Sequence, residues 1–267
     1  MAKQPLVSPF GESVSLKIFD PSETGDLTKD AARREEVKLE KRFTELQEMW
    51  YAQGTQSLLV VFQAMDAGGK DGAIEKVFDQ VNPQGVRVTS FKQPTPEDLA
   101  HDFLWRIHHH TPPKGYIGIF NRSHYEDVLI ARVNNLVPPA VWEKRYEHIN
   151  AFERLLADNG TRILKFYLHI DKDEQKKRFQ ERLDDPAKHW KFSKGDLVVR
   201  EQWDQYMTAY EAILTRCHFA HAPWHIVPAN KKWYRDYVIT QTIVQTLQDM
   251  QLAFPQAEDL KGIVIPD

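Results

Sequence analysis

The chain has 267 residues, of which 42% are hydrophobic and 27% are charged, and its formal net charge at pH 7 is −3. This composition is typical of a soluble globular protein, and the mild acidity argues against a general nucleic-acid-binding protein. No apolar run reaches the roughly 20 residues of a membrane-spanning helix, and the N-terminal residues lack the apolar core of a signal peptide. The lone cysteine, Cys217, is typical of a reducing compartment. We therefore expect a cytoplasmic protein with no nucleic-acid or membrane partner.

The first part of the chain divides into an arm and a long helix. Residues 1–26 contain Pro5, Pro9 and Pro21 and predict an irregular arm, followed by a single domain over 27–267. The heavily charged segment 26–53 predicts an amphipathic helix with a solvated face. Its expected apolar stripe consists of Val37, Leu39, Phe43, Leu46 and Trp50.

A strand, a small-residue loop and a helix follow. The continuous apolar run from Leu58 to Phe62 predicts a strand buried on both faces, and 71–80 predicts a helix. Between them, Gly68 and Gly69 allow backbone N–H groups to turn toward phosphate oxygens, while Lys70 and the helix N-terminus add positive charge. This is the layout of a phosphate-binding P-loop, or Walker A motif. Its predicted phosphate-binding residues are Ala67, Gly68, Gly69, Lys70, Asp71 and Gly72.

The loop departs from the usual G-x-x-x-x-G-K-[ST] pattern at two positions. Ala64 replaces the first glycine, and Asp71 replaces the hydroxyl residue that normally binds Mg²⁺. Asp66 is the candidate substitute, because a carboxylate directed at phosphate is repulsive unless a divalent cation lies between them. For Asp71, the simpler interpretation is a helix cap.

The rest of the chain alternates strands and helices. This order predicts a three-layer α/β/α fold with a mainly five-stranded parallel sheet, whose ligand-binding loops lie at the carboxyl ends of the strands. Segment 173–217 is too long for a plain crossover and predicts a helical lid. The expected strands are 85–91, 116–120, 162–170 and 224–227, and the expected helices are 96–110, 143–159, 173–183, 196–217 and 230–252.

Charged residues at the end of the strand over 116–120 form a second candidate group. The planar guanidinium of Arg122 is suited to phosphate oxygens. Asp127 would join Asp66 as the second carboxylate for Mg²⁺, which commonly takes one or two carboxylates together with phosphate and water. The alternative is a helix whose first turn is simply acidic.

The expected lid is rich in basic residues. Arg178 and Arg182 are four residues apart and share a helix face, so they are candidates for binding phosphate when the lid closes. The alternative is that the neighbouring acids pair with these residues on a solvated helix, which is the better interpretation for any single lysine. The other basic residues of this segment are Lys176, Lys177, Lys188, Lys191, Lys194 and Arg200.

Residues 230–233 (NKKW) resemble the guanine-binding N-K-x-D motif of GTPases. The resemblance fails at its decisive position, because Trp233 replaces the aspartate that pairs with guanine.

Taken together, the motifs resemble those of polyphosphate kinase family 2, from about Leu39 to Leu252. The resemblance rests on AMDAGGKDGAI, FKQPTPEDLAHDFLWRIH, PPKGYIGIFNRSHYEDVL, HWKFSKGDLVVREQWDQYMTAY and APWHIVPANKKWYRDYV. It implies a P-loop kinase fold like that of thymidylate kinases. It also implies reversible, Mg²⁺-dependent transfer of a terminal phosphoryl group between inorganic polyphosphate and a nucleotide, with Mn²⁺ as a substitute ion. Adenine nucleotides are the implied acceptors, guanine nucleotides a second class, and a homodimer or homotetramer the implied assembly.

The same resemblance suggests roles for individual residues. Asp66 and Asp127 match metal-binding carboxylates, and Lys70 matches the phosphate-loop lysine. RSHYEDVL looks most like the subgroup that phosphorylates both AMP and ADP, and we hypothesise that Glu126 positions a water or second metal ion when the shorter nucleotide is bound. The residues expected to contact the transferred phosphate are Arg122 and Arg178, and those expected at the nucleotide are Asn121, Arg122, Glu126 and Lys191.

Two other functions remain as alternatives. The first is an ATP-dependent nucleotide kinase of the same fold, since Asn121-Arg122-Ser123 resembles the D/E-R-S motif of such enzymes. Asn121 replaces the motif's acid, which often serves a neutral hydroxyl acceptor, so its loss favours an acceptor that is already a phosphate. The second is a non-catalytic nucleotide-binding module, which the presence of both candidate carboxylates disfavours.

Overall fold

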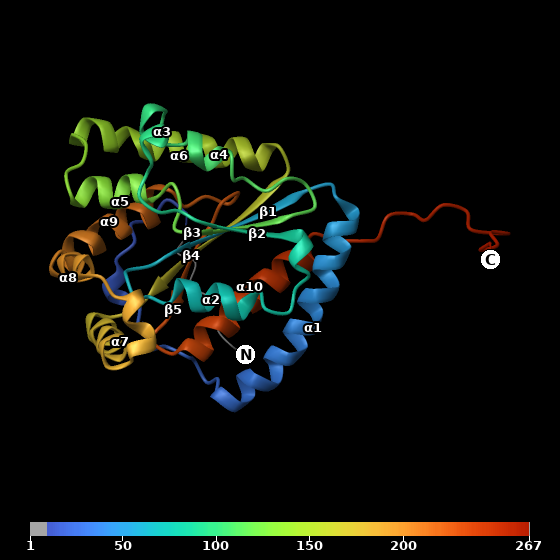
Figure 1. Ribbon diagram of the computed structural model, residues 1–267, viewed down its shortest axis with the longest axis horizontal. Helices are drawn as coiled ribbons and strands as arrows, with labels where there is room; N and C mark the ends of the chain where they lie inside the picture. Colours follow the sequence, from blue (N-terminus) through green and yellow to red (C-terminus); the bar gives the residue numbers. More distant parts are fainter. Residues whose placement is uncertain (1–9, 267) are drawn as a thin grey trace.

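The structure is a computed structural model that describes residues 10–266, so residues 1–9 of the expected arm lie outside the described part. A sheet runs through the centre of the body with helices on both faces, and the C-terminal tail extends away from it (Figure 1). Among the described residues, no helix is both long and apolar enough to span a bilayer.

The sheet has five parallel strands in the order β2-β3-β1-β4-β5. All seven residues of β1 are buried, which confirms the predicted strand. Because the neighbours β3 and β4 flank β1 on opposite sides, a crevice opens outside its carboxyl end, where ligands bind in such sheets. This topology confirms the predicted fold class. The strands are β1 Ser57–Gln63, β2 Val86–Ser90, β3 Ile117–Asn121, β4 Thr161–His169 and β5 Trp224–Pro228.

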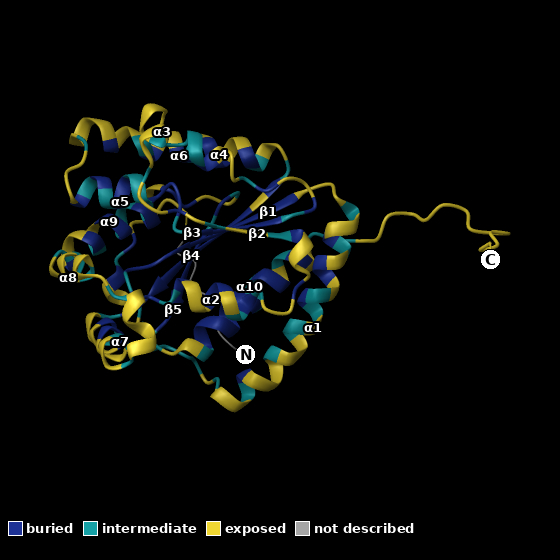
Figure 2. Ribbon diagram, viewed as in Figure 1, coloured by how far each residue is buried: buried dark blue, intermediate teal, exposed yellow. Residues whose placement is uncertain are grey.

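Helices cover both faces of the sheet, and the surfaces that they share with it are the most buried parts of the molecule (Figures 1 and 2). On one face, α10 contacts both α1 and α2. On the other face, α5 lies against α6 and α9. These helices are α1 Lys29–Gln53, α2 Lys70–Val77, α5 Glu126–Val133, α6 Pro139–Asp158, α9 Trp203–Arg216 and α10 Lys232–Asp249.

The remaining elements are short or lie at the edge of the body. They are η1 Leu16–Ile18, η2 Pro83–Gly85, α3 Pro96–Ala100, α4 Trp105–His108, α7 Lys172–Asp184, η3 Pro186–Lys191 and α8 Lys194–Glu201.

The long helix α1 follows the sequence prediction except at one residue. Thr28 caps it by accepting a hydrogen bond from the Ala31 N–H, and it ends at Gly54 in the left-handed conformation. Val37, expected on the apolar stripe, is 66% exposed. The reason is helical geometry, since Val37 lies about 200° around the axis from Leu39.

Two predicted helices are each broken into two. The Asp102 carboxylate accepts a hydrogen bond from the Leu104 N–H, and this local turn interrupts the predicted helix 96–110 between α3 and α4. The predicted helix 196–217 breaks at Gln202, which separates α8, where no residue is buried, from α9, which buries one face in the core.

The described part of the arm lies against the body. The Val14 N–H donates to Thr215 Oγ1 at 3.0 Å, and the Leu16 N–H donates to Glu211 Oε1 at 2.7 Å. Both arm residues are buried, so this segment is held on α9 although it contains little regular structure.

Candidate active site

The phosphate loop lies at the carboxyl end of the central strand β1. Gly69 caps α2 with a φ of 98°, in the left-handed region. A Cβ atom on Gly69 would collide with the guanidinium of Arg235, and one on Gly68 would lie 2.5 Å from Ala64 Cβ. The predicted need for glycine at both positions therefore has a conformational and a steric cause.

The first turn of α2 supplies backbone N–H groups that have no partner within the helix. Asp71 lies in this turn, but the cap residue is Gly69, so the interpretation of Asp71 as the cap is wrong. Its carboxylate instead accepts a 2.6 Å hydrogen bond from Asn121 Nδ2. This contact joins the phosphate loop to the end of β3.

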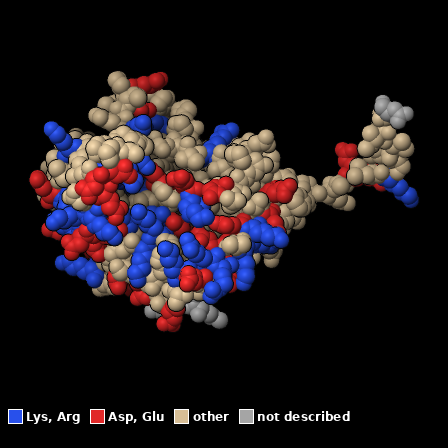
Figure 3. Space-filling view, turned by 60° about the horizontal axis from the view of Figure 1, so that its bottom comes forward, with Lys and Arg blue, Asp and Glu red and all other residues tan. Residues whose placement is uncertain are grey.

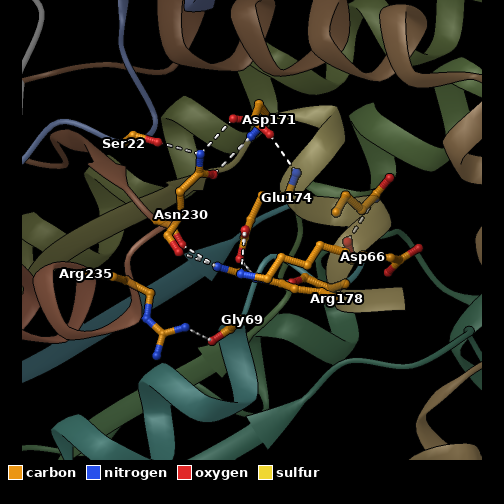
Figure 4. Close-up of polar contacts among 12 residues, drawn as sticks. Ser22, Asp66, Gly69, Asp171, Glu174, Arg178, Asn230 and Arg235 are labelled. Carbon is orange, nitrogen blue, oxygen red and sulfur yellow. Dashed lines mark hydrogen bonds and ion pairs between the residues drawn. The ribbon is translucent and has the colours of Figure 1, made fainter. Parts of the chain in front are cut away.

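Two buried arginines bind backbone carbonyls of the loop (Figure 4). Arg178 Nη1 donates to Ala67 O at 3.0 Å, and Arg235 Nη1 donates to Gly69 O at 3.1 Å. Since the C=O and the following N–H of a trans peptide point in opposite directions, carbonyls held by these arginines direct the next N–H groups away from them. The arginines thus stabilise the loop backbone and place positive charge beside it.

Arg178 also connects α7 to the end of β5. Its Nε donates to Glu174 Oε1 at 2.7 Å, and its Nη2 donates to Ala229 O at 2.6 Å and to Asn230 O at 3.2 Å. The Asn230 side chain in turn contacts Asp171 and Ser22 of the arm (Figure 4). The asparagine of the incomplete guanine motif is thus engaged in contacts within the protein.

A cavity of about 720 Å³ opens above the phosphate loop. Nine of its lining residues are basic and four are acidic, which makes it a site for a polyanion. The basic residues are Lys70, Lys92, Arg122, Arg178, Arg182, Lys188, Lys191, Lys232 and Arg235, and the acidic residues are Asp66, Asp71, Glu181 and Asp196. Figure 3 shows Lys and Arg side chains clustered on the face seen when the lower side of Figure 1 comes forward.

The structure brings most of the predicted site residues to this cavity. Arg122 Nη2 forms an ion pair with Asp66 Oδ1 at 3.2 Å, and Arg122 holds a φ of 61°, which costs roughly 1 kcal/mol or more in a residue other than glycine. The predicted residues at the cavity wall are Asp66, Ala67, Gly68, Gly69, Lys70, Asp71, Gly72, Asn121, Arg122, Arg178, Arg182 and Lys191.

Lys70 is directed back toward its own loop. Its Nζ donates to Ala64 O at 2.9 Å, and the residue is only 9% exposed. Burial, followed by the nearby positive charge of Arg122, lowers the pKa of Lys70. A bound phosphate would favour the charged ammonium and offer it a stronger acceptor.

Glu126 and Asp127 begin α5 and do not line the cavity, in contrast to the other predicted site residues. Asp127 Oδ1 accepts a 3.1 Å contact from Arg145 Nη1. Burial raises the pKa of Asp127 to about 6, against the lowering effect of Arg145. Burial also raises the pKa of Glu126, which Arg122 and Lys70 oppose. Both carboxylates therefore lie in an environment that favours a further positive charge, but only Glu126 has the phosphate-loop residues Lys70 and Asp66 among its charged neighbours.

Sequence reasoning missed Arg235, Lys232 and Lys92 as residues of the cavity. Lys232 and Arg235 lie in the first turn of α10, directly after β5 and at the same edge of the sheet as the phosphate loop. Basic residues immediately after a predicted strand were the available signal. Lys92 follows β2 in the same way.

The exposed part of the expected lid consists of η3 and α8, in which no residue is buried. Both interpretations of the basic residues in this segment apply, since they pair with acidic neighbours and also line the cavity. Lys188 forms an ion pair with Asp185 at 2.8 Å, and Arg182 lies 3.7 Å from Asp196, yet both basic residues line the cavity. Trp190 lines it as well and is 78% exposed. The aromatic residues of α9, in contrast, are buried: Trp203, Tyr206 and Tyr210.

Comparison with known proteins agrees with this geometry. Residues 26–255 match the family model described as polyphosphate kinase 2. The chain is 54% identical over 258 residues to an AMP/ADP-polyphosphate phosphotransferase of Meiothermus ruber, covering 96% of each protein. It is 45% identical over 228 residues to an ADP-polyphosphate phosphotransferase of Rhodopseudomonas palustris, covering 81% of this chain and 79% of the relative. The crystal structure of polyphosphate kinase 2 from Arthrobacter aurescens TC1 superposes with a TM-score of 0.88 at 43% identity, covering 94% of this chain and 95% of that one.

Proposed function

Because the chain belongs to the polyphosphate kinase 2 family, we propose that it reversibly transfers the terminal phosphoryl group of inorganic polyphosphate to AMP and ADP, with Mg²⁺ as cofactor. The observation that carries this proposal is the cavity over the phosphate loop, where nine basic side chains outnumber four acidic ones, as expected for a site that binds polyphosphate as well as a nucleotide. The Meiothermus ruber relative is named for both acceptors, which supports the dual specificity.

The reaction needs positioning and charge more than covalent chemistry. We assign Lys70 and Arg122 to the oxygens of the transferred phosphoryl group, because both line the cavity beside the phosphate loop. Arg178 contributes its charge and also holds the loop through Ala67 O. The acceptor is already a phosphate oxygen, so in-line transfer requires no dedicated general base.

The residues present fit a magnesium ion that is completed by its substrate. Among residues 10–266, no group of three or more His, Cys, Asp or Glu is arranged to hold a metal alone. Mg²⁺ needs no such cage, because it commonly takes one or two carboxylates and fills its remaining positions with phosphate and water. Asp66 and Asp127 are the residues that would hold it, and the environment that raises the pKa of Asp127 would become more favourable beside a cation. Bound Mg²⁺, or Mn²⁺ in its place, supplies positive charge to phosphate oxygens.

For the nucleotide we propose contacts with Asn121, Arg122, Glu126 and Lys191. Asn121, Arg122 and Lys191 line the cavity, and Glu126 is coupled electrostatically to Arg122 and Lys70. Its position beside the phosphate loop supports the hypothesis that Glu126 adapts the site to the shorter acceptor, AMP.

Within the single domain 27–267, the predicted lid can be restricted to a shorter segment. We propose that the outer lid, Pro186–Glu201, is the part that closes, because it contains no buried residue while α9 belongs to the core. Closure would bring Lys188 and Lys191 onto the phosphate chain.

Location, assembly and base preference complete the proposal. The lone cysteine favours the cytoplasm, and burial raises the pKa of Cys217 to about 12, so this thiol is inert. Family membership favours a homodimer or homotetramer, and adenine nucleotides as acceptors with guanine nucleotides as a second class to be compared.

The decisive experiment is nucleotide product analysis with long-chain polyphosphate, Mg²⁺ and AMP in the absence of ATP. ADP followed by ATP is the expected result and would establish both the donor and the dual acceptor range. ATP from ADP but no product from AMP would reject the dual specificity alone. No product from either nucleotide, with folded protein, would reject the proposal in favour of the ATP-dependent kinase.

A further inference from the structure

A fully buried polar network lies behind the active site, and none of its residues lines the cavity. The ammonium of Lys165 on β4 is 2.6 Å from Glu153 Oε2 on α6. The Tyr125 hydroxyl donates to Glu153 Oε1 at 2.8 Å, and His124 Nε2 lies 3.2 Å from the same oxygen. A strand, a helix and the loop before α5 therefore meet at one buried carboxylate.

The network is fully satisfied at its cationic centre. Lys165 Nζ donates to Tyr125 Oη at 2.8 Å and to Cys217 O at 2.7 Å, in addition to Glu153. Its ammonium also lies 5.3 Å from the ring centre of Tyr125 and 5.2 Å from that of Trp224. Burying these charges costs desolvation energy, and packed apolar residues of similar volume often give equal or greater stability. Stability alone is thus a weak explanation for the network.

The network holds the backbone segment that lies between Arg122 and the two acidic residues Glu126 and Asp127. His124 and Tyr125 lie two and three residues after Arg122, whose φ of 61° must be maintained by its surroundings, and directly precede Glu126 and Asp127. The Tyr125 N–H also donates to the buried Ser123 Oγ at 3.2 Å.

We propose that Glu153 and Lys165 are positioning residues for phosphoryl transfer: through His124 and Tyr125 they set the backbone that directs Arg122 toward the phosphates. The inference rests on the proposed phosphotransfer function. It predicts that loss of the network lowers kcat while the KM for polyphosphate, which depends on many basic residues of the cavity, changes little.

The test is the double variant Glu153→Leu/Lys165→Met, which removes both buried charges together and keeps the volume of the core. We expect a folded protein with a lower thermal midpoint, because buried polar atoms of His124, Tyr125 and Cys217 lose their partners. We also expect a kcat about tenfold lower with AMP or ADP as acceptor, and a KM for polyphosphate within about twofold. A folded double variant with wild-type kcat would overturn the inference.

A second pair of variants decides the question if the double variant does not fold. Tyr125→Phe removes one hydroxyl of the network, while Tyr146→Phe removes the hydroxyl of another buried tyrosine, which contacts Arg132 at 3.3 Å. A kcat at least about threefold lower for Tyr125→Phe than for Tyr146→Phe supports the positioning role, and equal values refute it. Wild-type enzyme assayed alongside separates the two proposals, since an inactive wild type would reject the phosphotransfer function instead.

Discussion

The phosphate loop and the outer lid both present basic side chains to the same cavity, but the two regions hold their charges differently. At the loop, Arg178 and Arg235 are buried and donate to backbone carbonyls of the loop. In the outer lid, Lys188 pairs with Asp185 on the surface, where solvent screens the ion pair. On the proposed function, we expect the buried charges at the loop to position the reacting phosphate and the exposed charges of the outer lid to bind the rest of the polyphosphate chain. Substitutions in the two regions should therefore differ in the size of their effects.

Lys70→Ala should remove the fixed charge nearest to the phosphate loop. We expect kcat/KM to fall by about a hundredfold or more, because the ammonium acts in a site shielded from water. Steady-state kinetics with polyphosphate and ADP measure the effect. Lys76→Ala is the control on the same helix, since Lys76 pairs with Glu40 at the surface, and it should retain wild-type activity. Equal activity of the two variants would remove Lys70 from the mechanism.

Asp127→Asn should lower activity by about a hundredfold while making the metal-free protein more stable. The carboxyl has an ordinary pKa of 3.8 and a pKa of about 6 in the folded protein. Between these pH values the folded state keeps a proton that the unfolded state releases, so the free energy of unfolding falls as pH rises. The Asp127→Asn variant does not lose stability in this way as pH rises. Its free energy of unfolding at pH 7 should therefore exceed that of the wild type by up to about 3 kcal/mol.

Urea unfolding of both proteins with EDTA, at pH 4 and at pH 7, measures this difference. The free energy of unfolding of Asp127→Asn should exceed that of the wild type at pH 7, and the excess should be small at pH 4. The exposed Asp204→Asn is the control and should change neither stability nor activity. A variant that is less stable than the wild type at pH 7 would show that the Arg145 ion pair outweighs the cost of burial.

Arg235→Gln should break the second contact to the loop carbonyls. We expect a loss of about 3 kcal/mol in the free energy of unfolding, because Asp236 is left buried without its partner, and a kcat about tenfold lower. Adding Asp236→Asn should restore stability but not kcat, which separates the two roles of the arginine. Arg34→Gln, at an exposed position of α1, is the control for unfolding. Recovery of kcat together with stability in the double variant would contradict a role at the loop.

Glu126→Asn tests whether the preference between AMP and ADP depends on a residue beside the phosphate loop. We expect the ratio of kcat/KM for AMP to that for ADP to change by at least about threefold, with AMP the more affected. Competition between the two nucleotides in one reaction measures the ratio directly. An unchanged ratio would refute the hypothesis for this residue.

Lys188→Ala should have the smallest effect, since it alters the exposed lid. We expect the KM for polyphosphate to rise about threefold and the free energy of unfolding to stay unchanged. The change in KM should shrink as salt concentration rises, because exposed charges are screened. Lys177→Ala is the matched control, as Lys177 pairs with Glu174 and does not line the cavity. A kcat effect as large as that of Lys70→Ala would abolish the distinction between the two regions.

Local sequence signals were sufficient for the phosphate-binding unit. The apolar run of β1 and the paired glycines before Lys70 specify strand, loop and helix through interactions between near neighbours. The parallel sheet followed from the alternation of strands and helices, whereas the order of its strands came only from the structure. Local turns were harder to predict. The Asp102 contact that divides α3 from α4 competes with a helix that the residues around it also favour.

By itself, the sequence determined the family, the fold class and the phosphate loop, because these depend on contiguous residues and on the period of apolar positions. Only the tertiary structure decided which charges meet. Arg235 reaches Gly69 across 166 residues of sequence, and Arg178 reaches Ala67 across 111. It also decided that Asp127 pairs with Arg145 at the start of α5 while Asp66 lines the cavity. Such contacts depend on how helices lie against the sheet, and burial in that packing shifts the pKa of a group such as Asp127 from the ordinary value of its residue type.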